Sequence, residues 1–439
     1  MKNLVEKNME IKTYKYPERA EWESLQQRPE LDVSSLFDTV KTILDDVKAE
    51  GDEAVRRYSE RFDKIHLENF LVSTTEMDEA ESMISDDLKD AIFFAHKNIS
   101  KFHISQYSDA IKVKTMPGVT CWQKPVAIEK VGLYVPGGTA PLFSTVLMLA
   151  IPAGLAACKE IILCTPPGKD GKIHPAILYA AKISLVSKIY KIGGVQAIAA
   201  MTYGTESVPK VYKIFGPGNQ YVVAAKQLVS LKDVAIDMPA GPSEVEIMAD
   251  DSANPAYIAA DFLAQAEHGA DSQSVLLTTS EMLADSVKNH INNQLSKLPR
   301  QDFIEKSLSN SRIIVLRDED EMIDFSNQYA PEHLIIQTEN YMALSERVIN
   351  AGSVFLGLYT PESAGDYASG TNHTLPTKGF AKMYSGVNLD SFFKKITFQE
   401  ITEEGIAQIG PIIEVMAENE QLFAHKNAVT ERLLDVVKN

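Results

Sequence analysis

Cysteine is scarce in this chain, and its three residues, Cys121, Cys158 and Cys164, show no C-x-x-C spacing. An odd number of thiols cannot pair completely, so the sequence predicts a reducing compartment rather than a disulfide framework. Cys158 and Cys164 lie in the apolar stretches GLAACKE and IILCTPP, which is typical of buried structural thiols rather than nucleophiles.

The chain also lacks an apolar run of about 18 residues, which a membrane-spanning helix would need. The N-terminal stretch has no apolar core of a secretory signal. We therefore expect a cytoplasmic protein with no membrane partner. Basic residues are in the minority, since 43 Lys and Arg against 60 Asp and Glu give a net charge of −17. This acidity argues against nucleic acid as a partner, because phosphates require clustered Lys and Arg.

Strand-like and helix-like segments alternate along most of the chain. Its 439 residues exceed one ordinary core, so two or more domains are expected. Over 131–240, short β-rich runs such as VGLYV alternate with helical stretches, which predicts a parallel, doubly wound sheet. Beyond residue 240, SEVEIMAD, QSVLLTTS, SRIIVLR and HLIIQT are further strand candidates. From about residue 388 the sequence predicts a polar, helix-rich tail.

The expected fold class is therefore α/β, with two Rossmann-like, doubly wound domains plus a small N-terminal and a helical C-terminal extension. We assign 1–30 to the N-terminal extension, 131–240 to one domain and 388–439 to the C-terminal extension. The other α/β domain is expected to be discontinuous and to combine 31–130 with 241–387.

Three glycine-rich loops each follow a predicted strand and lead into a predicted helix. They are YVPGGTAP (134–141), IGGVQ (192–196) and FGPGNQY (215–221). Glycine permits close backbone approach, and a helix N-terminus offers free N–H groups to a phosphate. None of the three is a G-x-G-x-x-G fingerprint. Tight turns and a nucleotide-type ligand both remain open on this pattern.

The segment AQAEHG ends a predicted helix that Asn254 can cap and Gly269 can terminate. Gln265 and His268 are three residues apart and share one face of the last turn, whereas Glu267 points elsewhere. An amide oxygen and an imidazole at this spacing can bind one metal, but Gln is a rare zinc ligand. Spacing alone therefore favours a plain helix end over a metal site.

Two further segments combine acids with histidines. YAPEHLII places Glu332 and His333 between a proline and a strand-like run, where they could form a general acid–base pair or a polar turn. SAGDYASGTNHTLPT is rich in small residues and holds Asp366 and His373. A loop of this length inside a folded domain tends to be functional.

The last such segment, ENEQLFAHKNAV, lies near the C-terminus. Helical spacing around a turn could bring Glu420 and His425 together. The residues alone favour an amphipathic surface helix.

Taken together, these segments resemble the histidinol dehydrogenase family nearly from end to end. The resemblance rests on VGLYVPGGTAPLFSTVLMLAIPA, IGGVQAIAAMTYGTESVPKV, KIFGPGNQYV, DMPAGPSEV, QAEHG, APEHL, GDYASGTNHTLPT and AHKNAV, in this order. It implies a four-electron oxidation of L-histidinol to L-histidine through L-histidinaldehyde, the last step of histidine biosynthesis. NAD and one Zn²⁺ per subunit would be the cofactors, with NAD in the 131–240 domain and zinc in the discontinuous domain.

The resemblance also implies the roles of individual residues. The zinc ligands would be Gln265, His268, Asp366 and His425, the last donated by the C-terminal extension of the partner in a homodimer. His333 would take the proton of the alcohol, and Glu332 would activate the water that hydrates the aldehyde. These six residues would contact the substrate, as would three further residues, Ser243, His373 and Glu420. NAD would be contacted by Tyr134, Gln196 and Asn219.

Three other interpretations remain open. A related zinc- and NAD-dependent dehydrogenase could act on another small amino or sulfonated alcohol. A zinc hydrolase would leave the three glycine-rich loops without a role. A non-catalytic metal-binding scaffold would leave Glu332 and His333 unexplained.

Overall fold

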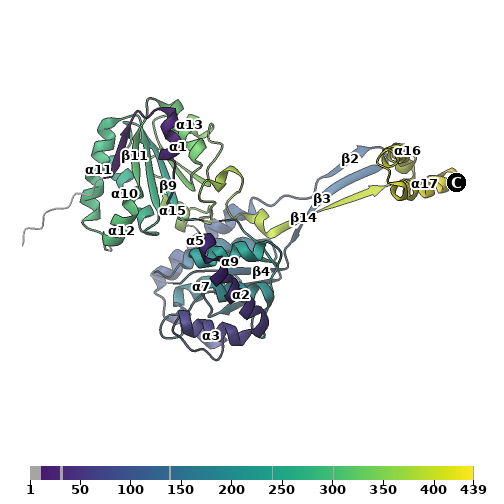
Figure 1. Ribbon diagram of the computed structural model, residues 1–439, viewed down its shortest axis with the longest axis horizontal. Coiled ribbons are helices and arrows are strands. Elements are labelled where there is room, and N and C mark those ends of the chain that lie inside the picture. Colours follow the sequence, from purple (N-terminus) through teal and green to yellow (C-terminus); the bar gives the residue numbers. More distant parts are fainter. Residues whose placement is uncertain (1–10, 30–32, 138–139, 240, 300, 439) are drawn as a thin grey trace, which may run out of the picture.

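The computed structural model describes residues 11–29, 33–137, 140–239, 241–299 and 301–438. Gly138 and Thr139 of the first glycine-rich loop, and residues 1–10 of the predicted N-terminal extension, lie outside this part of the chain. Figure 1 shows two lobes and a long arm that projects away from both and carries the C-terminus. Across the described residues, no helix combines the length and apolar character needed to cross a membrane.

The first lobe is built on a five-stranded parallel sheet in the order β6-β5-β4-β7-β8. Its strands are β4 (Lys130–Tyr134), β5 (Glu160–Cys164), β6 (Lys188–Tyr190), β7 (Lys213–Phe215) and β8 (Ala235–Ile236). The connecting helices are α6 (Phe143–Leu155), α7 (Pro175–Ile183), α8 (Gly194–Tyr203) and α9 (Gln220–Ser230). Because the strand order reverses beside β4, the loops beyond β4 and β7 frame the crevice where such sheets bind ligands.

Four helices that precede this sheet in sequence also belong to the first lobe. They are α2 (Phe37–Glu50), α3 (Asp52–Phe62), α4 (Thr74–Ser82) and α5 (Asp86–Ile104). The apolar stripe of α2, Val40 to Val47, packs against α8 and α9, and α5 packs against α6. This differs from the expected grouping of 31–130 with 241–387. The stripe needs an apolar surface to cover, and α8 and α9 provide one.

The second lobe is built on a six-stranded parallel sheet in the order β1-β11-β10-β9-β12-β13. Its strands are β1 (Lys12–Lys15), β9 (Glu244–Ala249), β10 (Gln273–Thr278), β11 (Arg312–Val315), β12 (His333–Gln337) and β13 (Ser353–Leu356). Strands β9, β10 and β12 are buried along their whole length, as parallel strands covered on both faces are. Part of the predicted N-terminal extension is thus the edge strand β1, which pairs with β11.

Helices cover the second sheet. They are the short α1 (Trp22–Leu25), α10 (Pro255–Ala266), α11 (Glu281–Leu295), α12 (Gln301–Leu308), α13 (Glu319–Tyr329), α14 (Tyr341–Ser345) and α15 (Glu362–Tyr367). Asn254 caps α10 by accepting the Ala256 N–H at 2.9 Å, as its sequence predicts. The α/β class with parallel sheets is therefore confirmed.

The arm consists of a three-stranded antiparallel sheet and two terminal helices. Its elements are β2 (Lys112–Met116), β3 (Val119–Ala127), β14 (Phe393–Ile401), α16 (Glu403–Asn419) and α17 (Phe423–Lys438). The predicted helix-rich tail therefore begins with a strand. In β14 the sequence FKKITFQEI contains β-branched and aromatic residues that favour a strand. There Phe398 stacks on Trp122 of β3, with ring centroids 5.4 Å apart.

Candidate active site

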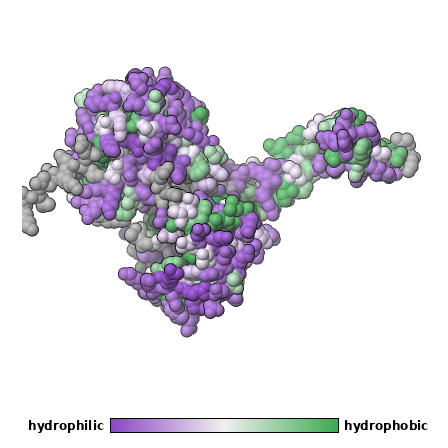
Figure 2. All heavy atoms as spheres, in the orientation of Figure 1, coloured by the Kyte–Doolittle hydropathy of each residue, from purple (hydrophilic) through white to green (hydrophobic). Residues whose placement is uncertain are grey.

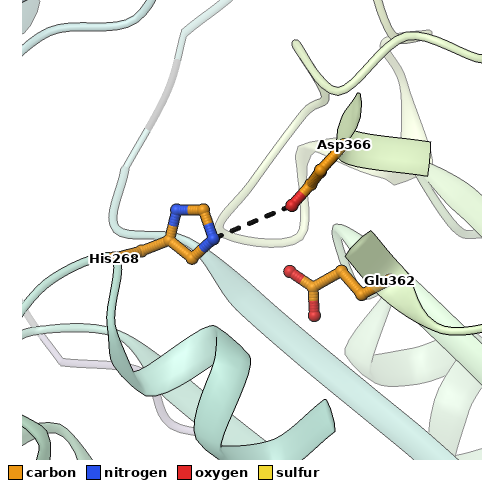
Figure 3. Close-up of side chains that lie close together, drawn as sticks. All are labelled: His268, Glu362 and Asp366. Carbon is orange, nitrogen blue, oxygen red and sulfur yellow. Dashed lines mark ion pairs between the residues drawn. The ribbon is translucent and has the colours of Figure 1, made fainter. Parts of the chain in front are cut away.

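A cluster of possible metal ligands lies in the second lobe, where the end of α10 faces α15. His268 follows α10, and Glu362 and Asp366 are four residues apart on α15. One ligand atom from each of these residues lies within 4.8 Å of the other two. His268 Nε2 is 3.8 Å from Asp366 Oδ2, and Figure 3 shows the Glu362 carboxylate beside this pair. Imidazole nitrogen and carboxylate oxygen are donors that suit zinc.

Gln265 lies in the last turn of α10, one turn before His268. Its side chain is fully buried, yet neither the oxygen nor the nitrogen of its amide has a hydrogen-bond partner in the described part of the chain. An unpaired buried amide is costly, so such a group calls for an additional ligand. Glu267, between Gln265 and His268, is exposed. His268 is also exposed, but it lies 3.8 Å from Asp366 and belongs to the ligand group, which does not include Glu267.

Glu332 and His333 lie at the start of β12, and both are held by the backbone of one residue, Glu244. The Glu244 N–H donates to Glu332 Oε2 at 2.9 Å, and the Glu244 carbonyl lies 3.2 Å from His333 Nδ1. Both side chains are buried, at 5% and 3% exposure. A left-handed residue, Ala330 (φ 56°), precedes them and ends α13. The turn that would direct both side chains to one site is thus present.

The tautomer of His333 follows from its hydrogen bond to Glu244. A carbonyl can only accept, so Nδ1 carries a proton, and Nε2 is the nitrogen that gains or loses the second proton. Nε2 has no hydrogen-bond partner within the described residues and lies 3.7 Å from Asp366 Oδ1. The basic nitrogen of His333 therefore faces the ligand cluster.

Burial and neighbouring charges shift the pKa values of these groups. Burial raises the pKa of Glu332 to about 8, although the neighbouring His333 opposes this shift. Burial alone would lower the pKa of His333, but the carboxylates of Glu362, Glu332 and Asp366 outweigh it and raise that pKa well above its usual range. For Asp366, burial favours the neutral acid, yet His333, His373 and His268 lower the net pKa. Strongly perturbed groups gathered in this way are typical of an active site.

Glu362 is a site residue that the sequence interpretation missed. Its side chain is 1% exposed, and Oε1 lies 3.7 Å from His333 Nδ1. Among the residues that the structure describes, neither carboxylate oxygen has a hydrogen-bond partner. Burial raises its pKa to about 8. The available signal was its spacing of four residues from Asp366, which places both carboxylates on one face of a helix.

His373 connects the cluster to the first lobe. Its Nδ1 lies 2.9 Å from the Asp366 carbonyl, and its Nε2 lies 3.1 Å from Thr145 Oγ1 on α6. Helix α6 begins just after the first glycine-rich loop, so this contact brings the N-terminal end of α6 to the ligand cluster. Ser243, the other predicted substrate contact in the body, is partly exposed and directly precedes Glu244.

A large cavity of about 1280 Å³ lies in the first lobe, at the carboxyl ends of its strands. All three glycine-rich loops contribute to its lining, and α2, α3 and α4 supply the opposite wall. Its lining includes the three predicted cofactor-binding residues, Tyr134, Gln196 and Asn219. A cavity of this size and position can hold a dinucleotide.

These three residues also order the loops of the cavity. The hydroxyl of Tyr134 accepts the Gly194 N–H at 3.0 Å. The Asn219 side chain accepts the N–H groups of Tyr221 and Val222, which caps α9. Gln196 donates to Asp63 of the opposite wall at 3.2 Å, and its amide oxygen is buried without a partner.

Glu420 and His425 lie elsewhere. Both are exposed, and they flank the turn between α16 and α17 at the far end of the arm (Figure 1). The described part of one chain therefore brings His268 and Asp366 together, with Gln265 one helical turn before His268, and places His425 on the arm.

These features define a two-lobed α/β protein with a cavity framed by strand-end loops in one lobe and, in the other, a buried Glu–His pair beside a nitrogen–oxygen ligand cluster. A model of the family described as histidinol dehydrogenase matches residues 26–433. The chain is 66% identical to the histidinol dehydrogenase of Bacteroides thetaiotaomicron, over 96% of this chain and 99% of that protein. It is 51% identical to that of Escherichia coli, over 93% and 94% of the two chains.

A crystal structure of histidinol dehydrogenase from Elizabethkingia anophelis has the same fold. Its TM-score is 0.95 at 54% identity, covering 97% of this chain and 98% of that one. The chain therefore belongs to the histidinol dehydrogenase family and is an oxidoreductase. The resemblance predicted from the sequence motifs is confirmed.

Proposed function

We propose that this protein oxidises L-histidinol to L-histidine through L-histidinaldehyde, as the last step of histidine biosynthesis, with NAD and one Zn²⁺ per subunit. The observation that carries the proposal is the buried pair Glu332 and His333, held by Glu244 beside the ligand cluster. Relatives that cover nearly the whole chain are named histidinol dehydrogenase, which supplies the substrate.

The residues present fit a zinc ion. Gln265 offers an unpartnered buried amide oxygen, and His268 and Asp366 offer nitrogen and oxygen donors that face one another. We assign these three residues as ligands, with His425 of the partner subunit as the fourth. Zinc, when bound, is redox-inert and would hold the amine and imidazole of the substrate.

The residues present also fit NAD. The cavity in the first lobe has the size for a dinucleotide, and Tyr134, Gln196 and Asn219 line it. The N-terminus of α9, capped by Asn219, faces this loop region and favours a phosphate. When bound, NAD⁺ accepts the hydride in each of the two oxidations. The contact between His373 and Thr145 brings α6, which follows the first loop, to the acid–base pair.

His333 acts as the general base of the alcohol step. Its Nδ1–H is held by the Glu244 carbonyl, so Nε2 accepts the hydroxyl proton of L-histidinol as the carbon loses a hydride and becomes an aldehyde. The ligand cluster orients the substrate so that its alcohol carbon lies at this nitrogen.

Glu332 acts in the aldehyde step. Its carboxylate takes a proton from water as the water oxygen adds to the aldehyde carbon. The protonated His333 returns the proton of the alcohol step to the aldehyde oxygen, which gives the hydrate and leaves His333 neutral. His333 then accepts a hydroxyl proton of the hydrate while the second hydride leaves, and the carboxylic acid forms. Oxidation through a hydrate needs a base but no thiol. Burial raises the pKa of Cys158 to about 12, which agrees with a cysteine that takes no part.

A homodimer with a shared site would explain the arm. The arm carries Glu420 and His425 at its far end. It also exposes apolar side chains: Figure 2 shows apolar surface along the arm, whereas the lobes are mostly hydrophilic in that view. These side chains include Ile396, Phe398 and Ile412. An arm of this kind is stabilised when it packs on a second copy, where His425 completes the zinc site and Glu420 contacts the substrate.

We place the protein in the cytoplasm, because its three cysteines are free thiols and need a reducing compartment. A related enzyme acting on another small amino or sulfonated alcohol is the alternative. The exposed carboxylate of Glu420 and the imidazole of His373 favour a substrate that carries both an amine and an imidazole.

The test is a stoichiometry. Purified protein is mixed with limiting L-histidinol and excess NAD⁺, and NADH is counted at completion. Two equivalents of NADH per L-histidinol support the proposal. One equivalent, or no reaction with zinc supplied, overturns it.

A further inference from the structure

Arg28 is the residue of the N-terminal segment that reaches furthest into the second lobe. Its guanidinium forms two hydrogen bonds with the Glu244 carboxylate, one of them from Nη2 to Oε1 at 3.0 Å. It also lies over the ring of Tyr329, 3.8 Å from the centroid. Only 15% of the Arg28 side chain and 3% of the Glu244 side chain are exposed. A planar guanidinium can satisfy this paired, stacked arrangement, whereas a lysine ammonium cannot.

The same guanidinium holds the segment that leads to the catalytic pair. Arg28 Nη2 donates to the carbonyl of Tyr329 at 2.6 Å and to that of Ala330 at 3.4 Å. Ala330 has the left-handed conformation that a non-glycine residue rarely adopts, so this turn depends on its surroundings. Glu332 follows two residues later.

Arg28 therefore joins both supports of the acid–base pair. Through the carboxylate of Glu244 it fixes the residue whose N–H binds Glu332 and whose carbonyl binds His333. Through the two carbonyls it fixes the turn from which Glu332 and His333 emerge. The hydroxyl of Tyr329, which donates to Gln273 at 2.7 Å, ties the same turn to strand β10.

We propose that Arg28 is a positioning residue of the active site, which holds β9 and the 329–333 turn in register so that Glu332 and His333 meet the substrate. The inference rests on the catalytic roles proposed for these two residues. Arg28 touches neither of them and acts through Glu244 and the turn. The N-terminal segment supplies no residue of the proposed reaction, but through Arg28 it supports the position of the catalytic pair.

The experiment compares Arg28→Ala and Arg28→Lys with the wild type in the complete zinc-loaded enzyme. We expect Arg28→Ala to lower kcat about 100-fold, as a small displacement of catalytic groups does, while KM for L-histidinol changes less than about threefold. Arg28→Lys restores the charge and part of the contacts, so its kcat should lie clearly above that of Arg28→Ala. Zinc content should stay at the wild-type level in both variants.

Arg312→Ala is the matched control. Arg312 holds the same N-terminal segment through the carbonyls of Leu25 and Gln27. Among the described residues it forms no hydrogen bond or ion pair with Glu244 or with the 329–333 turn, although its charge is felt by Tyr329. The kcat of Arg312→Ala should stay within about threefold of wild type. An equal loss of kcat in Arg312→Ala and Arg28→Ala would overturn the proposal, because anchoring of the segment would then suffice to explain it.

A double variant covers the case in which Arg28→Ala fails to fold because Glu244 is left buried and unpaired. Arg28→Ala with Glu244→Gln removes that charge and should still show the low kcat. Wild-type kcat in the double variant would refute positioning by the clamp. His333→Asn is assayed in parallel: full activity there contradicts the proposed function, whereas an inactive His333→Asn beside a normal Arg28→Ala contradicts only the role of Arg28.

Discussion

Glu332→Gln is the substitution that most sharply separates the two half-reactions. The amide keeps the size of the side chain, and its oxygen can still accept the Glu244 N–H, which lies 2.9 Å from Glu332 Oε2. What it loses is the ability to take a proton from water. Removing a positioned general base typically costs about 10²–10⁴-fold, or about 3–5 kcal/mol of transition-state stabilisation. We expect this loss in the aldehyde step and less than about tenfold in the alcohol step, in which His333 is the base.

The pH dependence of the aldehyde step adds a second signature. The basic form of Glu332 is the carboxylate, so the rate rises with pH as this group ionises. Burial raises the pKa of Glu332 to about 8, and a cation held by Asp366 would lower it, so the midpoint of the rise should lie near pH 8 or below. In Glu332→Gln this limb should disappear.

The assay supplies each substrate separately. Stopped-flow NADH absorbance is followed once with L-histidinol and once with L-histidinaldehyde, at saturating NAD⁺. Glu267→Gln, an exposed glutamate beside the ligand cluster, serves as the control and should behave like the wild type. Equal losses in both half-reactions of Glu332→Gln would refute the division of labour between Glu332 and His333.

Three further perturbations test other parts of the account. Tyr134→Phe removes the hydrogen bond to the Gly194 N–H, worth about 1 kcal/mol, so KM for NAD⁺ should rise about fivefold while KM for L-histidinol stays constant. An unchanged KM for NAD⁺ would show that this loop does not contribute to cofactor binding. Removal of zinc by a chelator should abolish activity and leave the circular dichroism spectrum unchanged. His268→Ala should contain no zinc by elemental analysis, and a fully zinc-loaded His268→Ala protein would contradict the role of His268 as a ligand. Burial raises the pKa of Glu246 from 4.5 to about 8, so the folded state binds the proton more tightly and the free energy of unfolding falls as pH rises from 4.5 to 8. Glu246→Gln should therefore recover about 4–5 kcal/mol of that free energy at pH 8, measured by urea unfolding, but little at pH 4. An equal effect at both pH values would disprove the link to this carboxyl group.

Residue patterns within a few positions of one another predicted the helix start and the turns described above. The capped start of α10 at Asn254 and the glycine-rich turns of the first sheet depend on neighbouring residues, and the structure has both. The spacing of Gln265 and His268 predicts a ligand pair only when it is combined with the family resemblance. By itself, that spacing favours a plain helix end.

Long-range packing could not be predicted in the same way. The apolar stripe of α2 fits any apolar surface, so its sequence does not reveal that it packs on the first lobe. Glu362 is an ordinary acid in sequence and becomes a site residue because α15 buries it against His333. Arg28 reaches Glu244 across 216 positions of the chain, and periodicity carries no information at that distance.

In the proposed dimer, the acid–base pair of one subunit works with a zinc ligand carried by the arm of the other. Asp366→Ala and His425→Ala each remove one proposed zinc ligand, and each homodimer should be inactive. Mixed subunits that are dissociated and reassociated form heterodimers with one intact site, so random pairing should restore about a quarter of wild-type activity. Activity that stays at the level of the separate variants, in a sample shown to contain the heterodimer, would contradict a site shared between subunits.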